Sequence, residues 1–411
     1  MTSKGARSPY ALRMGTGEMF EMTAATILSA APGTAVPLPQ GATSSRTVAV
    51  LPRAVSSPEG PTLVTPDKPR YETLKRLGEG SFGAVDLVLD NDIDRLVALK
   101  RLKPDAHDAD TVQRFADEIQ IVGKLEHPGI VTVHDVGLDE RGYFFVMKYL
   151  DGEDLETIIR KLREGDAETV QRFPMEERAR VFLATCRAVE FAHNKGLIHR
   201  DIKPGNIMVG RFGEVVLMDW GLAKRIGGPG NVAHGPARGG DTQTGTMLGF
   251  ALGTPAYMPP EQARGEHDRT DRRADVYSLC ATFFELFTLR HYLEPKADVN
   301  ALLEGVKNEE PMSAIAMHHK HQVPPEYTWI LQRGLMKDPD KRFQSVPELA
   351  SRIVKAMEGR NPVECPCTGL KRVNGTWSRF IDRYPYTSLF LAAFAAASAL
   401  VGVGTMVASL F

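Results

Sequence analysis

The stretch that decides the fold reads His199-Arg200-Asp201-Ile202-Lys203-Pro204-Gly205-Asn206. It places a carboxylate, a cation and an amide close together on the chain. A carboxylate can accept the proton of a hydroxyl group, a lysine can neutralise charge on a transferring phosphoryl group, and an amide oxygen can hold a magnesium ion. The run therefore predicts a phosphoryl-transfer loop, with Asp201 and Lys203 as catalytic residues and Asn206 as a metal ligand.

A glycine-rich run, residues 78–83, lies far upstream of this loop. Glycine lets a backbone approach phosphate oxygens closely and adopts φ angles that are closed to other residues. Alone, the run fits a phosphate lid over ATP and a dinucleotide-binding turn equally well. Residues 97–100 then read as a strand, whereas a dinucleotide fold would open a helix here. Lys100 is therefore expected to hold the α- and β-phosphates of ATP. The expected lid comprises Gly78, Glu79, Gly80, Ser81, Phe82 and Gly83.

The segment 109–125 predicts an amphipathic helix. Its apolar residues recur three or four positions apart, and the helix is expected to end before His127. Glu118 lies on or beside the apolar face, where a carboxylate is costly unless it is paired. Lys100 is its natural partner, and the pair would hold the lysine toward ATP. A solvated Glu118 is the alternative, because Asp117 is adjacent and one of the two must point outward.

An apolar strand is predicted over residues 215–218, and it leads into Asp219-Trp220-Gly221. Asp219 is expected to hold a magnesium ion that bridges the β- and γ-phosphates of ATP. Trp220 supplies apolar bulk, and it also carries an N–H group that needs a partner when it is buried. The acid and the amide of Asn206 would then be the two metal ligands.

With these motifs in this order, residues from about 71 to 357 resemble a Ser/Thr protein kinase domain of the Hanks type, most similar to the bacterial members. The resemblance implies an α+β fold with two lobes, a small β-rich N-lobe and a large helical C-lobe. Trp220 departs from the family's usual D-F-G motif, where a phenylalanine stands. This departure leaves the metal chemistry untouched and bears on how the motif moves between active and inactive packings.

The resemblance also implies a platform for the protein substrate. Residues 259–261 correspond to the family's A-P-E motif, with proline in place of alanine. Glu261 is expected to form a buried ion pair with Arg342. Asp275 resembles the helix aspartate that braces the catalytic loop. An acid favoured by the dipole at the start of a helix is the alternative for Asp275.

The substrate class follows from the same resemblance. Lys203 with Pro204 resembles the serine/threonine branch rather than the tyrosine branch. Small-molecule antibiotic kinases share a similar loop but lack a long activation segment, which this chain has. Thr254 is expected to form a hydrogen bond near Asp201 and to help select a hydroxyl substrate.

The predicted activation segment lies between Ala223 and Pro255 and is rich in glycine. Such a composition cannot order itself by burial. A phosphate on one of its threonines could organise it by pairing with Arg200. Autophosphorylation is therefore predicted as the activating step, and simple loop polarity is the alternative. The candidate phosphosites are Thr242, Thr244 and Thr246.

The nucleotide is expected between the two lobes. The resemblance implies ATP with Mg²⁺, for which Mn²⁺ can substitute, and proteins with serine or threonine hydroxyls as substrates. Met147 would stand at the gatekeeper position, and the hinge would offer backbone groups to adenine. The expected adenine and hinge contacts are Val85, Ala98, Met147, Lys148, Leu150 and Met208.

The ends of the chain differ in composition from its centre. Residues 1–68 are rich in Ala, Pro, Ser, Thr and Gly and predict a disordered extension without a signal peptide. The kinase-like domain is placed at 69–358, with the N-lobe at 69–147 and the C-lobe at 151–358. Residues 359–386 then form a juxtamembrane linker.

Residues 387–411 contain no charged side chain and predict a transmembrane helix. As a helix they would span about 37 Å, against a bilayer core about 30 Å thick. Burial as a core helix is the alternative. Basic residues precede the span, so the positive-inside tendency places the domain in the cytoplasm. We expect a C-terminal tail anchor in the cell membrane with lipid as a partner, and spaced small residues such as Ser398 and Gly402 could support a homodimer.

The formal net charge of −1 argues against a nucleic-acid binder driven by bulk charge. Two functions from different classes remain. The first is an active Ser/Thr protein kinase in bacterial signal transduction. The second is a membrane-anchored pseudokinase that acts as a scaffold or nucleotide sensor. Completeness of the catalytic set favours the enzyme, because pseudokinases commonly lack one or more of its members.

Overall fold

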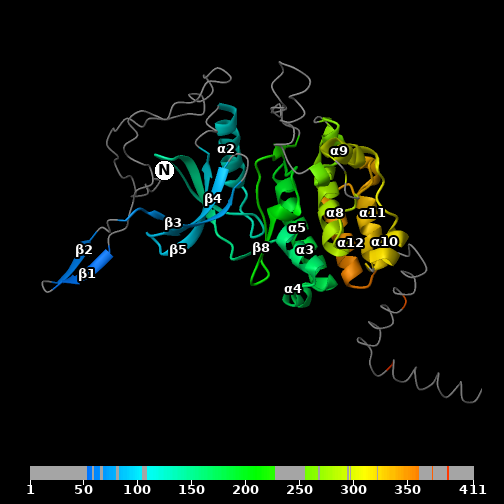
Figure 1. Cartoon of the computed structure of the whole chain (residues 1–411), viewed down its shortest axis with the longest axis horizontal. Coiled ribbons are helices and arrows are strands. Elements are labelled where there is room, and N and C mark those ends of the chain that lie inside the picture. Colours follow the sequence, from blue (N-terminus) through cyan, green and yellow to red (C-terminus); the bar gives the residue numbers. More distant parts are fainter. Residues whose placement is uncertain are drawn as a thin grey trace, which may run out of the picture.

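The computed structural model describes residues 53–57, 60–64, 68–79, 83–103, 109–226, 255–266, 269–293, 296, 298–321, 323–360, 373 and 387. Over these ranges the chain forms a small lobe built on a β-sheet and a larger helical lobe, which lie beside each other in Figure 1. The two-lobed α+β arrangement expected from the sequence is therefore present. Seven predicted site residues lie outside the described ranges: Gly80, Ser81, Phe82, Thr242, Thr244, Thr246 and Thr254.

The small lobe contains a five-stranded antiparallel sheet. Side chains alternate between its faces. Val97 and Leu99 are buried in a core on one face, whereas Ala98 and Lys100 belong to the other. The second face is turned toward the large lobe, because Lys100 lies 3.7 Å from Asp219. The strands, in sheet order, are β3 (Tyr71–Glu79), β4 (Gly83–Asp90), β5 (Arg95–Leu102), β7 (Gly142–Lys148) and β6 (Val133–Asp139).

Helix α2 (Ala109–Val122) packs on this sheet. Val112 and Phe115 are buried against Leu102 and Phe145 of the strands. The helix ends three residues before the predicted end at residue 125. Residues 123 and 124 form a turn instead, and the glycine at position 123 weakens the helix there because its backbone loses more freedom on folding.

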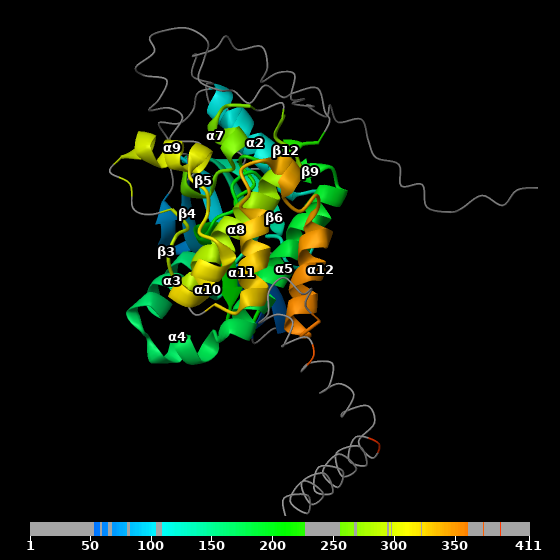
Figure 2. The same ribbon diagram turned by 90° about the vertical axis from the view of Figure 1, so that its right-hand side faces the viewer.

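The large lobe is built around two long helices, α5 and α8. Helix α8 is buried along almost its whole length, as expected for a helix at the centre of a lobe. Phe182 of α5 stacks on Phe283 of α8 with ring centroids 4.0 Å apart. Figures 1 and 2 both show α5, α8, α11 and α12 side by side. The helices are α3 (Leu155–Glu164), α4 (Ala167–Arg172), α5 (Met175–Asn194), α7 (Pro260–Ala263), α8 (Arg272–Thr288), α9 (Val299–Asn308), α10 (Ala314–His321), α11 (Pro325–Gly334) and α12 (Val346–Met357).

Short strands at the lobe boundary place the loop residues that the sequence singled out. Strands β10 and β11 form an antiparallel hairpin, in which Ile207 pairs with Leu217. The backbone N–H of Met218 donates to the carbonyl of Asn206 at 2.8 Å. Asn206 and Asp219 are thereby brought to the same end of the hairpin. The short elements are β8 (Gly152–Asp154), β9 (Leu197–Ile198), β10 (Ile207–Gly210), β11 (Val215–Leu217), β12 (Lys224–Arg225) and the 3₁₀ turns η1 (Pro204–Asn206), η3 (Pro255–Tyr257) and η5 (Pro339–Lys341).

Residues 1–68 are predicted to be a disordered extension, but two short strands are present near the end of this region. Strands β1 (Arg53–Ser57) and β2 (Gly60–Val64) form an antiparallel ribbon. Pro58 and Glu59 separate the two strands. Short runs that contain β-branched residues, such as Val55, Thr62 and Val64, can pair locally, which composition averaged over 68 residues does not reveal.

Within the described ranges, no helix has the length and apolar character needed to cross a membrane. The predicted span at 387–411 lies outside these ranges, apart from Thr387.

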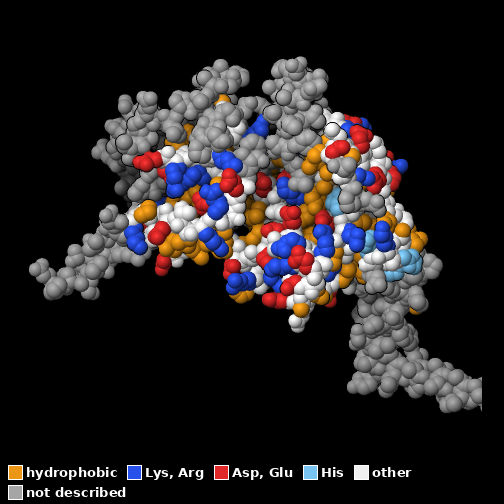
Figure 3. Space-filling model, viewed as in Figure 1, with side chains coloured by type: hydrophobic (Ala, Val, Ile, Leu, Met, Phe, Trp, Pro, Cys, Tyr) orange, Lys and Arg blue, Asp and Glu red, His pale blue; other side chains and the backbone are white. Residues whose placement is uncertain are grey.

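On the face shown in Figure 3, Lys and Arg side chains are interspersed with Asp and Glu over both lobes.

Candidate active site

The loop that follows β9 holds its chemical groups in direct contact. The Asp201 carboxylate accepts hydrogen bonds from Lys203 Nζ at 2.8 Å and from Asn206 Nδ2 at 3.1 Å. The same amide nitrogen also donates to the Asp201 carbonyl at 2.8 Å. Both bonds use the nitrogen of the Asn206 amide, so within the described residues neither of them occupies its oxygen, a group that can bind a metal ion.

Asp275 of α8 braces the backbone of this loop. It accepts hydrogen bonds from the N–H groups of His199 at 2.8 Å and Arg200 at 2.9 Å. His193 Nε2 lies 2.8 Å from the same carboxylate. Burial opposes ionisation of Asp275, but the hydrogen bonds from His193 and from the backbone N–H of Arg200 help to outweigh it, and its pKa is lowered. Arg200 has φ of +71°, a conformation uncommon outside glycine. The bracing role inferred for Asp275 is therefore confirmed in its geometry.

His199 connects the loop to the end of the β10–β11 hairpin. Its Nδ1 accepts the N–H of Asp201 at 3.2 Å, so its Nε2 carries the proton and donates to the carbonyl of Met218 at 3.1 Å. The ring lies 4.5 Å from the ring of Trp220. Trp220 is fully buried, and its indole N–H has no hydrogen-bond partner among the described residues. A buried tryptophan N–H usually has a hydrogen-bond partner, and the described residues supply none for Trp220.

Lys100 joins the two lobes. Its ammonium lies 2.6 Å from Oε1 and 2.9 Å from Oε2 of Glu118 on α2, and 3.7 Å from Oδ1 of Asp219. Burial disfavours the ammonium, yet the two carboxylates outweigh it and raise the pKa of Lys100. Glu118 therefore points inward, and the solvated alternative is excluded. In contrast, Gln113 donates to Asp117, the residue beside Glu118, at 2.8 Å.

Asp219 stands beyond the hairpin end with φ of +57°. Partial desolvation between the lobes raises its pKa, but the charges of Lys100 and Lys203 bring it below its ordinary value. About half of the side-chain surface, 48%, is exposed. A charged, accessible carboxylate at the same end of the hairpin as the Asn206 amide is a donor set that suits Mg²⁺ or Mn²⁺.

The five-stranded sheet of the small lobe carries several of the residues that are expected to contact adenine. Ala98 pairs with Met147 across β5 and β7, and Val85 pairs with Lys100 across β4 and β5. Met208 lies in β10, at the lobe boundary. Gly83 is required by close approach, because a Cβ there would lie 2.7 Å from the Arg101 carbonyl. The remaining described residues of this group lie at the β3 end or the hinge: Gly78, Glu79, Lys148 and Leu150.

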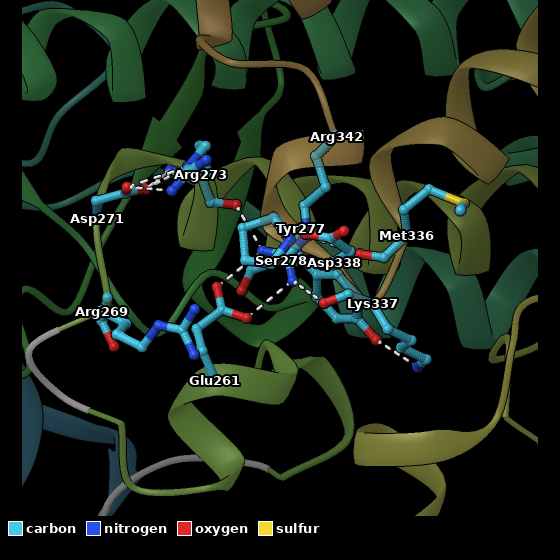
Figure 4. A network of polar contacts seen from close by, with 12 residues as sticks. Glu261, Arg269, Asp271, Arg273, Tyr277, Ser278, Met336, Lys337, Asp338 and Arg342 are labelled. Carbon is cyan, nitrogen blue, oxygen red and sulfur yellow. Dashed lines mark hydrogen bonds and ion pairs between the residues drawn. The ribbon is translucent and has the colours of Figure 1, made fainter.

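Glu261 and Arg342 anchor the short helix α7 to the large lobe (Figure 4). Arg342 donates from Nη1 to Oε1 and from Nη2 to Oε2 of Glu261, both at 2.8 Å. Both side chains are buried. The ion pair predicted from the sequence is therefore confirmed.

Two further polar residues were not found by sequence reasoning. Gln262 donates from Nε2 to the carbonyl of Arg200 at 3.3 Å. Lys337 is buried and donates from Nζ to the hydroxyl of Tyr277 at 3.0 Å and to the carbonyl of Val306 at 2.9 Å. Neither contact has a sequence signal, because both join elements that are far apart in the chain.

The chain was compared with protein families and with individual known proteins, and both comparisons match it to protein kinases. A family model described as a protein kinase domain matches residues 71–354. The chain is 32% identical over 303 residues to serine/threonine-protein kinase PknD of Protochlamydia amoebophila, which covers 72% of the chain and 30% of that protein. It is 34% identical over 298 residues to serine/threonine-protein kinase PknB of Mycolicibacterium smegmatis, which covers 71% of the chain and 44% of that protein.

A probable serine/threonine-protein kinase of Streptomyces coelicolor is 32% identical over 325 residues, which covers 78% of the chain and 44% of that protein. The match thus spans less than half the length of each of these three relatives.

Proposed function

The chain belongs to the protein kinase domain family, and on this premise we propose that it is an active Ser/Thr protein kinase. It transfers the γ-phosphoryl group of ATP to serine and threonine hydroxyls of proteins. The observation that carries the proposal is the contact of Lys100 with both Glu118 and Asp219, beside the bonded set of Asp201, Lys203 and Asn206. A site held in this way has every charged group that phosphoryl transfer requires.

Each group has a role in this proposal. Asp201 orients the substrate hydroxyl and accepts its proton, while Lys203 neutralises charge on the transferring group. Lys100, held by Glu118, binds the α- and β-phosphates. Asp219 and the Asn206 oxygen would hold Mg²⁺, which would supply positive charge to neutralise the phosphates of ATP. Catalysis then consists of positioning and electrostatic stabilisation.

We propose that autophosphorylation activates the enzyme. The threonines Thr242, Thr244 and Thr246 lie outside the described residues, so the support is the composition of their segment. Arg200, directly before Asp201, supplies the guanidinium that a phosphothreonine would pair with. Thr254 is proposed to lie near Asp201 and to favour hydroxyl substrates.

The domain plan is also a proposal. Residues 69–358 form the kinase domain, residues 359–386 link it to the membrane, and residues 387–411 anchor it there with the domain in the cytoplasm. The support is the uncharged sequence of the last segment and the basic residues before it. Flotation with phospholipid vesicles tests this: the full chain should float and a chain ending at residue 386 should not.

The test of the activity separates the enzyme from a scaffold or nucleotide sensor. The full chain is incubated with labelled Mg-ATP and casein, and the modified amino acids are identified after hydrolysis. Phosphoserine or phosphothreonine in casein supports the proposal. Binding of ATP without transfer, under conditions in which the protein is folded, supports the pseudokinase reading.

A further inference from the structure

Two consecutive residues of helix α7, Glu261 and Gln262, connect it to two different parts of the large lobe. Glu261 reaches Arg342, as Figure 4 shows. Gln262 reaches the carbonyl of Arg200, to which its Nε2 donates at 3.3 Å. The first contact fixes α7 to the segment before α12, and the second joins it to the loop that carries Asp201.

The peptide unit between Arg200 and Asp201 is held on both sides. Its carbonyl accepts the bond from Gln262, and its N–H donates to His199 Nδ1 at 3.2 Å. The N–H of Arg200 is held separately by Asp275 at 2.9 Å. With φ of +71° at Arg200, this backbone adopts an uncommon, strained conformation that persists only where its surroundings fix it. The orientation of this peptide plane determines where the Asp201 side chain begins.

The amide orientation of Gln262 is fixed by its neighbour. A carbonyl accepts hydrogen bonds only, so the nitrogen and not the oxygen of the amide must face it. The oxygen of Gln262 is then buried, and it has no hydrogen-bond partner in the part of the chain that the structure describes. Leaving a buried acceptor unpaired is costly. Contacts among the described residues therefore account for the nitrogen of this amide but not for its oxygen.

We propose that Gln262 is a positioning residue, which transmits the placement of helix α7 to Asp201 through the carbonyl of Arg200. The proposal rests on the proposed kinase activity for its kinetic consequence. Because α7 begins five residues after Pro255, where the predicted activation segment ends, Gln262 would link the end of that segment to the catalytic carboxylate. Its loss should slow transfer and leave the binding of ATP unchanged, since the Lys100 contacts do not involve it.

The test uses the full chain with Gln262→Met, which keeps the length of the side chain and removes the donor. The control is Gln332→Met on α11, where Gln332 accepts the N–H of Ala314 at 3.0 Å, away from the loop. For Gln262→Met we expect kcat for casein phosphorylation to fall about tenfold, which corresponds to about 1.4 kcal/mol of transition-state stabilisation. The KM for ATP should change less than about twofold, and the control should match the parent.

Amide hydrogen exchange gives a readout that does not depend on activity. The amide of Asp201 should exchange faster in Gln262→Met than in the parent and in Gln332→Met. If kcat and exchange both equal those of the parent, the proposal is overturned. If the parent transfers no phosphate, the proposed function fails, and the exchange rates alone decide whether Gln262 holds the loop. Gln262→Glu, which also removes the donor, replaces Gln262→Met if the latter does not fold.

Discussion

Arg342 and Glu261 form a two-bond ion pair in the interior of the large lobe, and every donor of the guanidinium is used. Nη1 and Nη2 each bond one oxygen of Glu261. The three remaining donors reach backbone carbonyls: Nε that of Met336, Nη1 that of Arg273 and Nη2 that of Lys337. A buried charge is tolerated when it is paired and fully hydrogen-bonded. This pair therefore fixes α7, and with it the proposed substrate platform.

Breaking this pair from one side should be strongly destabilising. Arg342→Met leaves the Glu261 carboxylate buried without its partner, which costs about 3–5 kcal/mol. Adding Glu261→Gln removes that charge, so the double variant should lose less than the sum of the two single variants. Urea unfolding of the four proteins measures this coupling as a double-mutant cycle. Additive losses would show that the two residues do not interact as described.

Glu118→Gln should slow phosphoryl transfer without unfolding the small lobe. The glutamine keeps the size of the side chain but loses the charge that holds Lys100 2.6 Å away. We expect kcat/KM to fall by at least about tenfold, because Lys100 is then free to turn toward Asp219. Gln113→Glu on the same helix is the comparison, because Gln113 contacts Asp117 and not the lysine. Equal rates for Glu118→Gln and the parent would contradict the role of Glu118.

Because of Lys337, the free energy of unfolding should depend on pH in the alkaline range. Burial lowers its pKa from 10.5 to about 8, against the attraction of Glu310. Between these two values the unfolded chain still binds a proton that the folded chain has released. The free energy of unfolding should therefore rise with pH over this window, by at most about 3 kcal/mol.

Lys337→Met removes this contribution. Unfolding by urea at about pH 7.5 and about pH 9.5 should show the rise in the parent and a smaller rise in the variant. Lys341→Met is the matched control, because the Lys341 side chain is 65% exposed. If Lys337→Met and Lys341→Met show the same pH dependence, Lys337 does not titrate in this window.

Trp220→Phe should lower the free energy of unfolding only slightly, although Trp220 is fully buried. The smaller ring leaves a cavity worth about 1 kcal/mol or somewhat more. It also removes a buried N–H without a partner among the described residues, which relieves about 1–3 kcal/mol. The two effects oppose each other, so the free energy of unfolding should change by less than about 1.5 kcal/mol. A loss above about 3 kcal/mol would show that the indole N–H is satisfied in the folded protein.

The sequence predicted the parts of the site whose chemistry lies in short motifs. The contacts of Asp201 with Lys203 and Asn206 span a few residues, so their spacing is visible in one dimension. The partnership of Lys100 with Glu118 was predictable because an inward glutamate needs a cation. Gln262 and Lys337 were not predictable, since each acts on a carbonyl that becomes a neighbour only when helices pack. The ribbon at residues 53–64 was hidden by a composition typical of disorder.

The most direct measurement follows phosphate incorporation into the full chain by intact mass during incubation with Mg-ATP, beside an Asp201→Asn control. The parent should gain phosphate, the control should gain none, and the phosphate should map to Thr242, Thr244 or Thr246. If the parent is folded and binds ATP but gains no phosphate and modifies no protein substrate, the chain is not the kinase proposed.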